Sequence, residues 1–359
     1  MKNKFSTRFF SFCFTCLIII VFNASLFAAP KKNIVILATG GTIAGTGHSS
    51  TNTAYSAGQL SIDQLLQDIP ELKNIAKITG EQVCNIASQE MNNEIWLKLA
   101  RRVNTLVKSP NVEGIVITHG TDTMEETAYF LNLVIRTKKP IVFVGSMRPA
   151  TALSADGPLN LYNAVVLASN DKSAGKGVLV SLNDDILSAR EATKTHTTSI
   201  DAFRNRDFGV LGYIIGKDVQ FYQQSTRRHT YQSEFNIEEI KEELPKVDIV
   251  YGYANNNGFM IEAAVKKQAK GIIHAGTGNG NIFPLTFKAL IDARKKDILV
   301  VRSSRGNAGI VTRGTEVDDA KHSFITADTL NPQKARILLM LALGKTNEVS
   351  DIQRMFDEY

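Results

Sequence analysis

The sequence predicts an α/β protein with two domains, a larger N-terminal and a smaller C-terminal one, each a mostly parallel sheet flanked by helices. Three observations lead to this prediction. The chain has 359 residues, and domains usually hold roughly 100 to 200 residues. Short uninterrupted runs of β-branched and aliphatic residues recur, which is typical of strands buried on both faces. Helical patterns lie between several of these runs, and this alternation favours parallel sheets covered by helices.

Strands are expected at the aliphatic runs, which occupy residues 33–38, 112–117, 140–144, 177–182, 248–253, 271–274 and 297–301. Helices are expected at 123–136, 158–168, 284–293 and 332–343. The least patterned stretch, 221–246, is polar and charged, and we interpret it as a linker. The sequence thus predicts an N-terminal α/β domain at 30–220 and a C-terminal α/β domain at 247–359.

The first 29 residues differ from the rest of the chain. Basic residues precede an apolar run at 9–22, and small residues follow it up to Ala29. This layout is typical of a secretory signal, so we predict a signal peptide at 1–29 and a periplasmic mature protein. The alternative is an uncleaved N-terminal anchor, because residues 9–29 are roughly long enough to span a bilayer.

Charge and cysteine content exclude several classes of protein. The net charge of the whole chain is +6. Without residues 1–29 it is +3, because the remaining chain has 38 basic and 35 acidic side chains. So small a charge, without basic clusters interleaved with aromatics, argues against nucleic acid as a partner. Cys84 is the one cysteine of the predicted mature chain, so no intramolecular disulfide is expected.

Small and polar loops directly follow the expected strands. They occupy residues 39–42, 118–122, 145–149, 183–185, 276–281 and 303–305. Ligands of open parallel sheets bind beyond the carboxyl ends of strands, so we expect these loops to share one edge. In the first loop, two glycines leave room beside the hydroxyl of Thr42, which becomes a nucleophile only when a base removes its proton. A plain strand-to-helix turn or a phosphate loop would explain the same residues.

Two further groups are candidates for chemistry. Thr121 and Asp122 precede an expected helix start, where Thr123 to Glu126 form a predicted capping box. Free N–H groups there could stabilise an oxyanion or hold a carboxylate, or the region could be purely structural. Lys194 could act as a base if burial lowers its pKa, or it could be an ordinary solvated lysine.

Signatures of other enzyme classes are absent from the sequence. It has no G-x-S-x-G elbow, no P-loop and no H-E-x-x-H. The glycines at 276, 278 and 280 have G-x-G-x-G spacing, not the dinucleotide pattern. The histidines His119, His196 and His274 show no metal-ligand spacing, so no metal site is expected.

Two motifs resemble a known family. ATGGTIA at 38–44 and THGTDTM at 118–124 look like the two signature motifs of bacterial L-asparaginases. Further similarity lies at 80–82, 88–89, 154–164, 316–319 and 331–336, so the resemblance covers essentially everything after residue 29. The chain is similar to the type II, periplasmic L-asparaginases of the asparaginase/glutaminase family. The resemblance implies hydrolysis of L-asparagine to L-aspartate and ammonia, with catalysis in the N-terminal domain.

The resemblance also implies roles for individual residues. Thr42 corresponds to the family's nucleophile, which forms an acyl-enzyme, and Tyr55 to the tyrosine of a mobile lid. Glu316 corresponds to an acid that works with this tyrosine. A second constellation is implied for Thr121, Asp122 and Lys194, whose task is proton transfer and orientation of the amide or the water.

Substrate binding and assembly follow from the same resemblance. Ser88, Gln89 and Asp122 are implied to hold the α-carboxylate and α-ammonium of the substrate. Asn281 and Glu316 are implied to reach the site from a neighbouring subunit of a homotetramer. No metal, cofactor or nucleic acid is implied, and no stable membrane association after signal cleavage. One departure is Ser146, where the family pattern leads us to expect alanine.

Three alternatives stay open at this point. A glutaminase-asparaginase of broader specificity is one, because glutamine differs by one methylene, worth only about 1 to 3 kcal/mol in a pocket. A non-catalytic exported amino-acid-binding protein would explain export and a carboxylate site. A cytoplasmic asparaginase or amidotransferase subunit of the same fold is opposed by the N-terminal segment.

Overall fold

The computed structural model describes residues 30–359 except 52–53, 242 and 307. The predicted signal peptide at 1–29 lies outside the described residues and stays a prediction. Residues 32–359 form one compact unit, which is the subject of everything below. No helix within the described residues is long and apolar enough to cross a membrane.

The N-terminal part of this unit is built on an eight-stranded sheet with the order β10-β9-β6-β5-β4-β3-β1-β2. Its strands are β1 (Asn33–Gly40), β2 (Lys77–Ile86), β3 (Gly114–Thr118), β4 (Ile141–Val144), β5 (Val178–Leu182), β6 (Asp185–Ser188), β9 (Gly212–Ile215) and β10 (Asp218–Phe221). Strands β1 to β5 pair in parallel, and β6, β9 and β10 extend the sheet in antiparallel fashion. A separate two-stranded ribbon joins β7 (Thr193–Lys194) to β8 (Phe203–Arg204).

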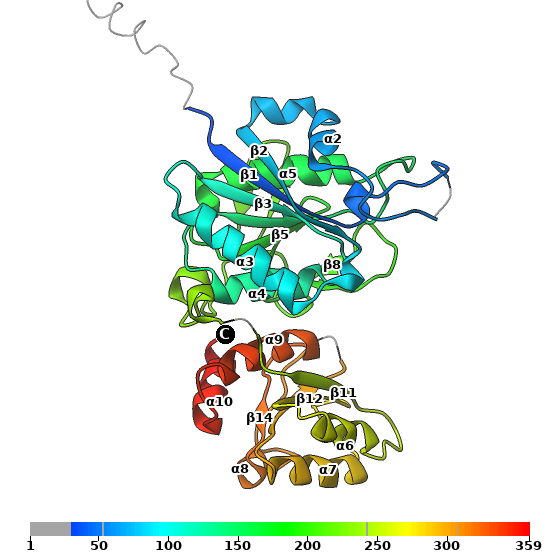
Figure 1. The fold of residues 1–359 in the computed structure, drawn as a ribbon, viewed down its shortest axis with the longest axis vertical. Helices are drawn as coiled ribbons and strands as arrows, with labels where there is room; N and C mark the ends of the chain where they lie inside the picture. Colours follow the sequence, from blue (N-terminus) through cyan, green and yellow to red (C-terminus); the bar gives the residue numbers. More distant parts are fainter. Residues whose placement is uncertain (1–29, 52–53, 242, 307) are drawn as a thin grey trace, which may run out of the picture. The chain divides into compact units, whose positions relative to one another are not determined.

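Helices cover both faces of this sheet. They are α2 (Ile62–Gln67), α3 (Asn93–Lys108), α4 (Met124–Val134) and α5 (Gly157–Ser169). Figure 1 shows α2 and α5 on one side of the sheet and α3 and α4 on the other. In β1, Ile34 and Ile36 belong to the apolar cluster with α5, while Val35 and Leu37 belong to the cluster with α3 and α4. Both faces of the strand are buried, which explains its uninterrupted aliphatic sequence.

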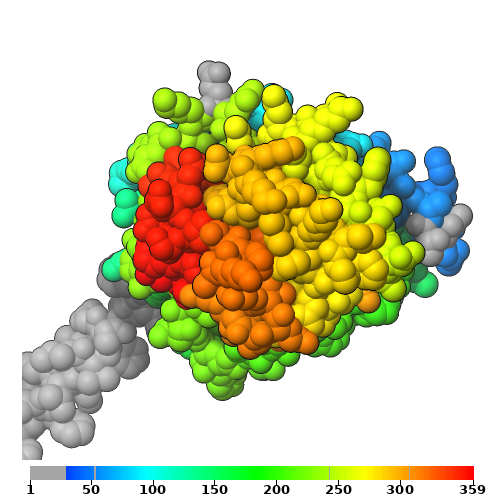
Figure 2. Space-filling view, turned by 90° about the horizontal axis from the view of Figure 1, so that it is seen from below, coloured from blue at the N-terminus to red at the C-terminus, as the bar shows by residue number. Residues whose placement is uncertain are grey.

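The C-terminal part is built on a four-stranded parallel sheet with the order β11-β12-β13-β14. Its elements are β11 (Val247–Tyr251), α6 (Phe259–Lys266), β12 (Gly271–Gly276), α7 (Pro284–Arg294), β13 (Leu299–Ser304), α8 (Asp319–His322), β14 (Ile325–Thr326), α9 (Pro332–Leu343) and α10 (Val349–Glu358). Residues of α6 and α7 share an apolar cluster with one face of the sheet, and residues of α9 and α10 with the other. Figure 2 shows the surface formed by these C-terminal residues, in yellow to red.

Helix α9 joins the two sheets through their cores. It packs on α4 as well as on β11, β12 and β13. The apolar cluster that contains Phe130 of α4 therefore continues through Leu338 of α9 to Ile273 of β12. The predicted fold class is confirmed, since a large N-terminal sheet and a separate parallel C-terminal sheet are both flanked by helices. The domain and linker boundaries at 30–220, 221–246 and 247–359 stay predictions.

Several elements and one predicted motif differ from the sequence-based expectations. Strand β2 was not expected, because nearly all of its side chains are partly or well exposed at the sheet edge and they form no aliphatic run. The capping box predicted at the start of α4 is wrong. Thr123 is the N-cap residue but makes no side-chain cap bond, because its hydroxyl donates to the carbonyl of Ser88 at 2.7 Å instead.

Candidate active site

The loop after β1 holds Thr42 close to the loop after β3. Gly40 and Gly41 have φ angles of 102° and 81°, in the region that favours glycine. A Cβ atom on Gly41 would lie 2.4 Å from the backbone nitrogen of Gly120, so only glycine permits this approach. Thr42 then opens a short 3-10 turn, Thr42–Ala44, and is 7% exposed. The two signature motifs therefore meet at Gly41 and Gly120.

The hydroxyl of Thr42 contacts a tyrosine. Thr42 Oγ1 and Tyr55 Oη are 2.8 Å apart, and either oxygen can donate. Tyr55 is 43% exposed and precedes Ser56, whose backbone pairs with Thr46. A phenolic oxygen at this distance is within reach of the proton that Thr42 must lose to become a nucleophile.

A second constellation gathers around Lys194 in β7. Lys194 Nζ donates to Thr121 Oγ1 at 2.9 Å and to Asp122 Oδ1 at 2.5 Å. Thr121 is buried and Asp122 is exposed. The three side chains form a chain of proton-carrying groups between the interior and the surface of the site. Such groups can transfer protons or orient an amide or a water.

Ser88 and Gln89 lie together in a 3-10 turn, Ser88–Glu90. The buried Ser88 hydroxyl accepts a hydrogen bond from the backbone N–H of Asp122 at 3.2 Å. Gln89 is exposed, and within the described part of the chain it makes no hydrogen bond to another candidate residue. Ser88 is thus brought to the second constellation directly and Gln89 only as its neighbour.

Asn281 and Glu316 form a separate pair. Asn281 lies after β12, and its Nδ2 donates to Oε2 of Glu316 at 2.6 Å. Among the residues that the structure describes, no hydrogen bond or ion pair joins this pair to Thr42, Thr121 or Lys194. A single chain therefore brings seven of the nine candidate residues to the loops after β1, β2 and β3 and to β7, and places the other two elsewhere.

Two charged residues near the site were not expected from the sequence. Glu125 of α4 accepts a hydrogen bond from the backbone N–H of Lys194 at 3.2 Å, and Lys334 of α9 donates to the carbonyl of Ala192 at 2.6 Å. Both side chains are buried in helices that are otherwise largely apolar. A charged residue on the buried face of such a helix needs a partner, and that was the available signal.

His119 is buried beside Thr121. Burial lowers its pKa to about 4, so the ring is neutral at pH 7. Its Nδ1 lies 2.7 Å from the carbonyl oxygen of Gly120, to which the neutral ring donates when Nδ1 carries the proton. This contact holds the loop after β3. A metal-binding group of three His, Cys, Asp or Glu residues does not occur in the described ranges.

Ser146 lies buried in the loop after β4. Its hydroxyl donates to the carbonyl of Arg148 at 2.7 Å, within the same loop. The carboxylate of Asp156 accepts the backbone N–H groups of Met147 and Arg148, both at 2.9 Å. The extra hydroxyl of Ser146 is therefore engaged inside its own loop.

Comparison with known proteins identifies the family. The N-terminal asparaginase family model matches residues 33–227, and the glutaminase/asparaginase C-terminal domain model matches 246–356. A protein of Haemophilus influenzae named probable periplasmic L-asparaginase is 52% identical over 332 residues, 92% of this chain and 94% of that protein. L-asparaginase 2 of Escherichia coli is 48% identical over 345 residues, 96% of this chain and 98% of that protein.

Relatives with other names also match. A glutaminase-asparaginase of Pseudomonas fluorescens is 52% identical over 329 residues, covering 91% of this chain and 90% of that protein. A crystal structure titled probable cytoplasmic L-asparaginase, from Campylobacter jejuni, superposes with a TM-score of 0.89. It is 49% identical and covers 92% of this chain and 100% of its own.

The periplasmic location predicted from the sequence is not upheld. The matching crystal structure is titled cytoplasmic, while one relative of similar identity is named periplasmic, so likeness to these proteins fixes no compartment. The physical reason is that export depends on an N-terminal targeting segment, whereas the similarity is carried by the folded body. The segment at 1–29 lies outside the described residues, and we assign no location.

Both family models match, and together they cover most of the chain. Several relatives are about half identical over more than nine tenths of its length. Such matches to a family of hydrolases leave no basis for a non-catalytic binding protein. The chain belongs to the asparaginase family of amidohydrolases.

Proposed function

We propose that the protein hydrolyses L-asparagine to L-aspartate and ammonia, with Thr42 as the nucleophile. The observation that carries the proposal is the approach of two hydroxyl-bearing loops at Gly41 and Gly120, where the backbone of Gly120 leaves no room for a Cβ on Gly41. Thr42 and Thr121 each follow one of these glycines, in the loops after the neighbouring parallel strands β1 and β3. The family, whose members are named asparaginases, supports the choice of substrate.

In the first step, Thr42 Oγ1 attacks the side-chain carbonyl carbon of asparagine while its proton passes to Tyr55 Oη and Tyr55 gives up its own hydroxyl proton. The C–N bond then breaks, the proton released by Tyr55 reaches the amide nitrogen, which leaves as ammonia, and an ester joins aspartate to Thr42. Water hydrolyses this ester and restores the hydroxyl. The 2.8 Å contact between the two hydroxyls supports the first proton transfer.

Lys194, Thr121 and Asp122 serve proton transfer and orientation on the other side of the bond that breaks. The bonds of Lys194 Nζ to Thr121 and Asp122 support this assignment. Ser88, Gln89 and Asp122 hold the charged α-groups, because a carboxylate needs N–H and O–H donors and an ammonium needs a carboxylate. The proposed mechanism uses no metal or cofactor.

The protein is proposed to be a homotetramer in which Asn281 and Glu316 complete the site of a neighbouring subunit, where Glu316 assists Tyr55. Their separation from Thr42 within one chain supports this proposal. Mixing inactive Thr42→Ala and Glu316→Ala variants under conditions of subunit exchange should restore part of the activity, because some sites then receive both native residues. Full activity of an isolated monomer would contradict it.

Glutamine is a second candidate substrate. A relative that is 52% identical is named glutaminase-asparaginase, so the family includes enzymes with both activities. One extra methylene changes binding by only about 1 to 3 kcal/mol. The ratio of the two activities is therefore to be measured rather than assumed.

Ammonia release with asparagine and with glutamine, measured in parallel for the wild-type protein and Thr42→Ala, tests the proposal. We expect asparagine turnover by the wild type and its loss in the variant. Saturable asparagine binding without turnover in either protein would overturn the enzymatic proposal. The glutamine rate sets the specificity.

A further inference from the structure

A cluster of buried polar residues contacts the segment that precedes β7. It is separate from the Thr42–Tyr55 pair and from the group formed by Thr121, Asp122 and Lys194. Lys334, in the first turn of α9, is 1% exposed. Its Nζ donates to the carbonyls of Arg190 at 2.7 Å and Ala192 at 2.6 Å. Burial lowers the pKa of Lys334 to about 8, against the opposing influence of Glu125 and Glu191. One ammonium group of the C-terminal part thus holds two carbonyls of the segment that leads to Lys194.

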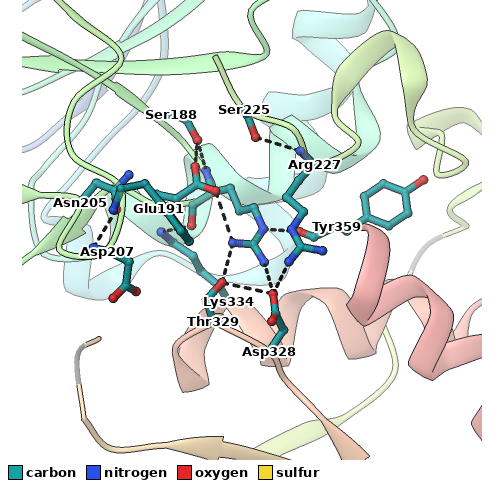
Figure 3. A network of polar contacts seen from close by, with 12 residues as sticks. Ser188, Glu191, Asn205, Asp207, Ser225, Arg227, Asp328, Thr329, Lys334 and Tyr359 are labelled. Atoms are coloured by element: carbon teal, nitrogen blue, oxygen red, sulfur yellow. Dashed lines mark hydrogen bonds and ion pairs between the residues drawn. The ribbon is translucent and has the colours of Figure 1, made fainter. Parts of the chain in front are cut away.

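The side chain of Arg190 is anchored to the same C-terminal part. Its guanidinium donates to Thr329 Oγ1 at 2.9 Å, to Asp328 Oδ2 at 3.3 Å and to the carbonyl of Tyr359. Arg227 donates to the same carboxylate at 2.6 Å. Figure 3 shows Asp328 facing Arg227, with Thr329 and Lys334 beside it. The residues before β7 are therefore fixed through a side chain as well as through carbonyls.

A third contact reaches Lys194 itself. Glu125 is 5% exposed, and its Oε2 accepts the backbone N–H of Lys194 at 3.2 Å. Its Oε1 accepts from Gln333 Nε2 at 2.5 Å, beside Lys334 at the start of α9. The backbone of Lys194 is thus connected to α9 through the carboxylate of Glu125. The backbone of Ala192 is connected to α9 through the ammonium of Lys334.

We propose that Lys334 is a positioning residue of the asparaginase reaction, which sets the backbone at 190–194 so that Lys194 Nζ meets Thr121. The inference rests on the proposed role of Lys194 in the function above. A lysine side chain is long and flexible, so the place of its ammonium depends on where its backbone is held. A displacement of about 1 Å in a catalytic group can cost about 100-fold in rate. Lys334 touches no reacting atom and acts through Lys194.

The test is steady-state kinetics of Lys334→Met, which keeps most of the length of the side chain and removes the ammonium. We expect kcat for asparagine to fall about 10- to 100-fold. KM should change much less, because Ser88, which is proposed to hold the substrate, bonds the backbone N–H of Asp122 and the hydroxyl of Thr123 and makes no hydrogen bond to residues 190–194. Loss of a general fold-stabilising residue would not produce this separation of kcat from KM.

Gln353→Met is the matched control. Gln353 is also buried, lies in α10, and bonds the backbone N–H and carbonyl of Thr326 at 2.8 and 3.1 Å. Gln353 has no hydrogen bond to residues 190–194. We therefore expect kcat of the Gln353→Met variant to stay within about twofold of wild type at temperatures below the melting temperature of the variant. Equal losses of kcat in both variants would overturn the proposal, as would a wild-type kcat in Lys334→Met.

Glu125→Ala provides a second variant should Lys334→Met fail to fold. It releases the backbone of Lys194 from α9 and should show the same fall in kcat with little change in KM; an unchanged kcat would overturn the proposal. Lys194→Ala separates the two levels of inference. If that variant keeps wild-type kcat, the proposed role of Lys194 is wrong. If it loses activity while Lys334→Met and Glu125→Ala keep theirs, only the positioning role is wrong.

Discussion

The hydroxyl oxygens of Thr42 and Tyr55 lie 2.8 Å apart, although only Thr42 is buried. We predict that Tyr55→Phe lowers kcat for asparagine about 100-fold or more, because the nucleophile loses its proton acceptor. The free energy of unfolding should change by less than about 0.5 kcal/mol, since the tyrosine is largely at the surface. Steady-state kinetics with thermal unfolding checks both. Tyr222→Phe, at an exposed tyrosine outside the site, is the control.

Lys194 is predicted to be essential for the chemical step. Lys194→Met should lower kcat by a factor of about 100 to 10,000, the usual contribution of general acid–base catalysis. Lys98→Met serves as a control, since Lys98 Nζ also donates to a backbone carbonyl, that of Val83, at 2.7 Å. A kcat within tenfold of wild type in Lys194→Met would contradict its assignment to proton transfer.

The ion pair of Arg302 and Asp319 is predicted to stabilise the C-terminal part. Both side chains are 1% exposed, and the guanidinium donates to the carboxylate at 2.6 and 2.7 Å. Arg302→Met should lower the free energy of unfolding by about 3 to 5 kcal/mol, because a buried carboxylate loses its partner. Chemical denaturation measures the loss. Replacing both residues, as in Arg302→Met with Asp319→Asn, should recover part of it, and no recovery would argue against the ion pair as the cause.

Buried histidines predict how stability depends on pH. Burial lowers the pKa of His274 to about 4, with a smaller contribution from Arg302, and burial lowers that of His119 to about 4. Between about pH 6.5 and 4 these two histidines bind protons in the unfolded chain but stay neutral in the folded chain. The free energy of unfolding therefore decreases as the pH falls through this window. His274→Leu should reduce this loss by on the order of 1 to 2 kcal/mol at pH 5.

Leucine suits position 274 because its cross-strand neighbour Val250 belongs to the apolar cluster with α6 and α7. Denaturation of wild type and variant at pH 5 and pH 7.5 gives the difference. The same change in stability at both pH values would mean that the charge of His274 is not the cause.

Much of the fold could be predicted from the sequence because its central strands are buried on both faces. Aliphatic runs marked β1, β3, β4 and β5 to within a few residues. The edge strand β2 and the antiparallel strands β9 and β10 expose alternate side chains, so they carry no such run. The amphipathic helix α3 was also not predicted, since its polar face interrupts the apolar pattern.

The site could be predicted only in part. Spacing pointed to Thr42 and Thr121 as residues after strands, while the roles of Tyr55, Asn281 and Glu316 came from resemblance alone. The contacts of Glu125 and Lys334 with the segment around Lys194 could not be predicted from local sequence, because they join residues 69 to 144 positions apart. The capping box predicted at Thr123 is wrong for the same reason. The Thr123 hydroxyl donates to the carbonyl of Ser88, which is distant in the sequence.

The most direct measurement is a search for the acyl-enzyme. Wild type and Thr42→Ala are saturated with asparagine, quenched in acid during turnover and mapped by peptide mass spectrometry. The account predicts an aspartyl group on Thr42 in the wild type and none anywhere in the variant. An aspartyl group on another residue, or an equal amount in Thr42→Ala, would contradict Thr42 as the nucleophile.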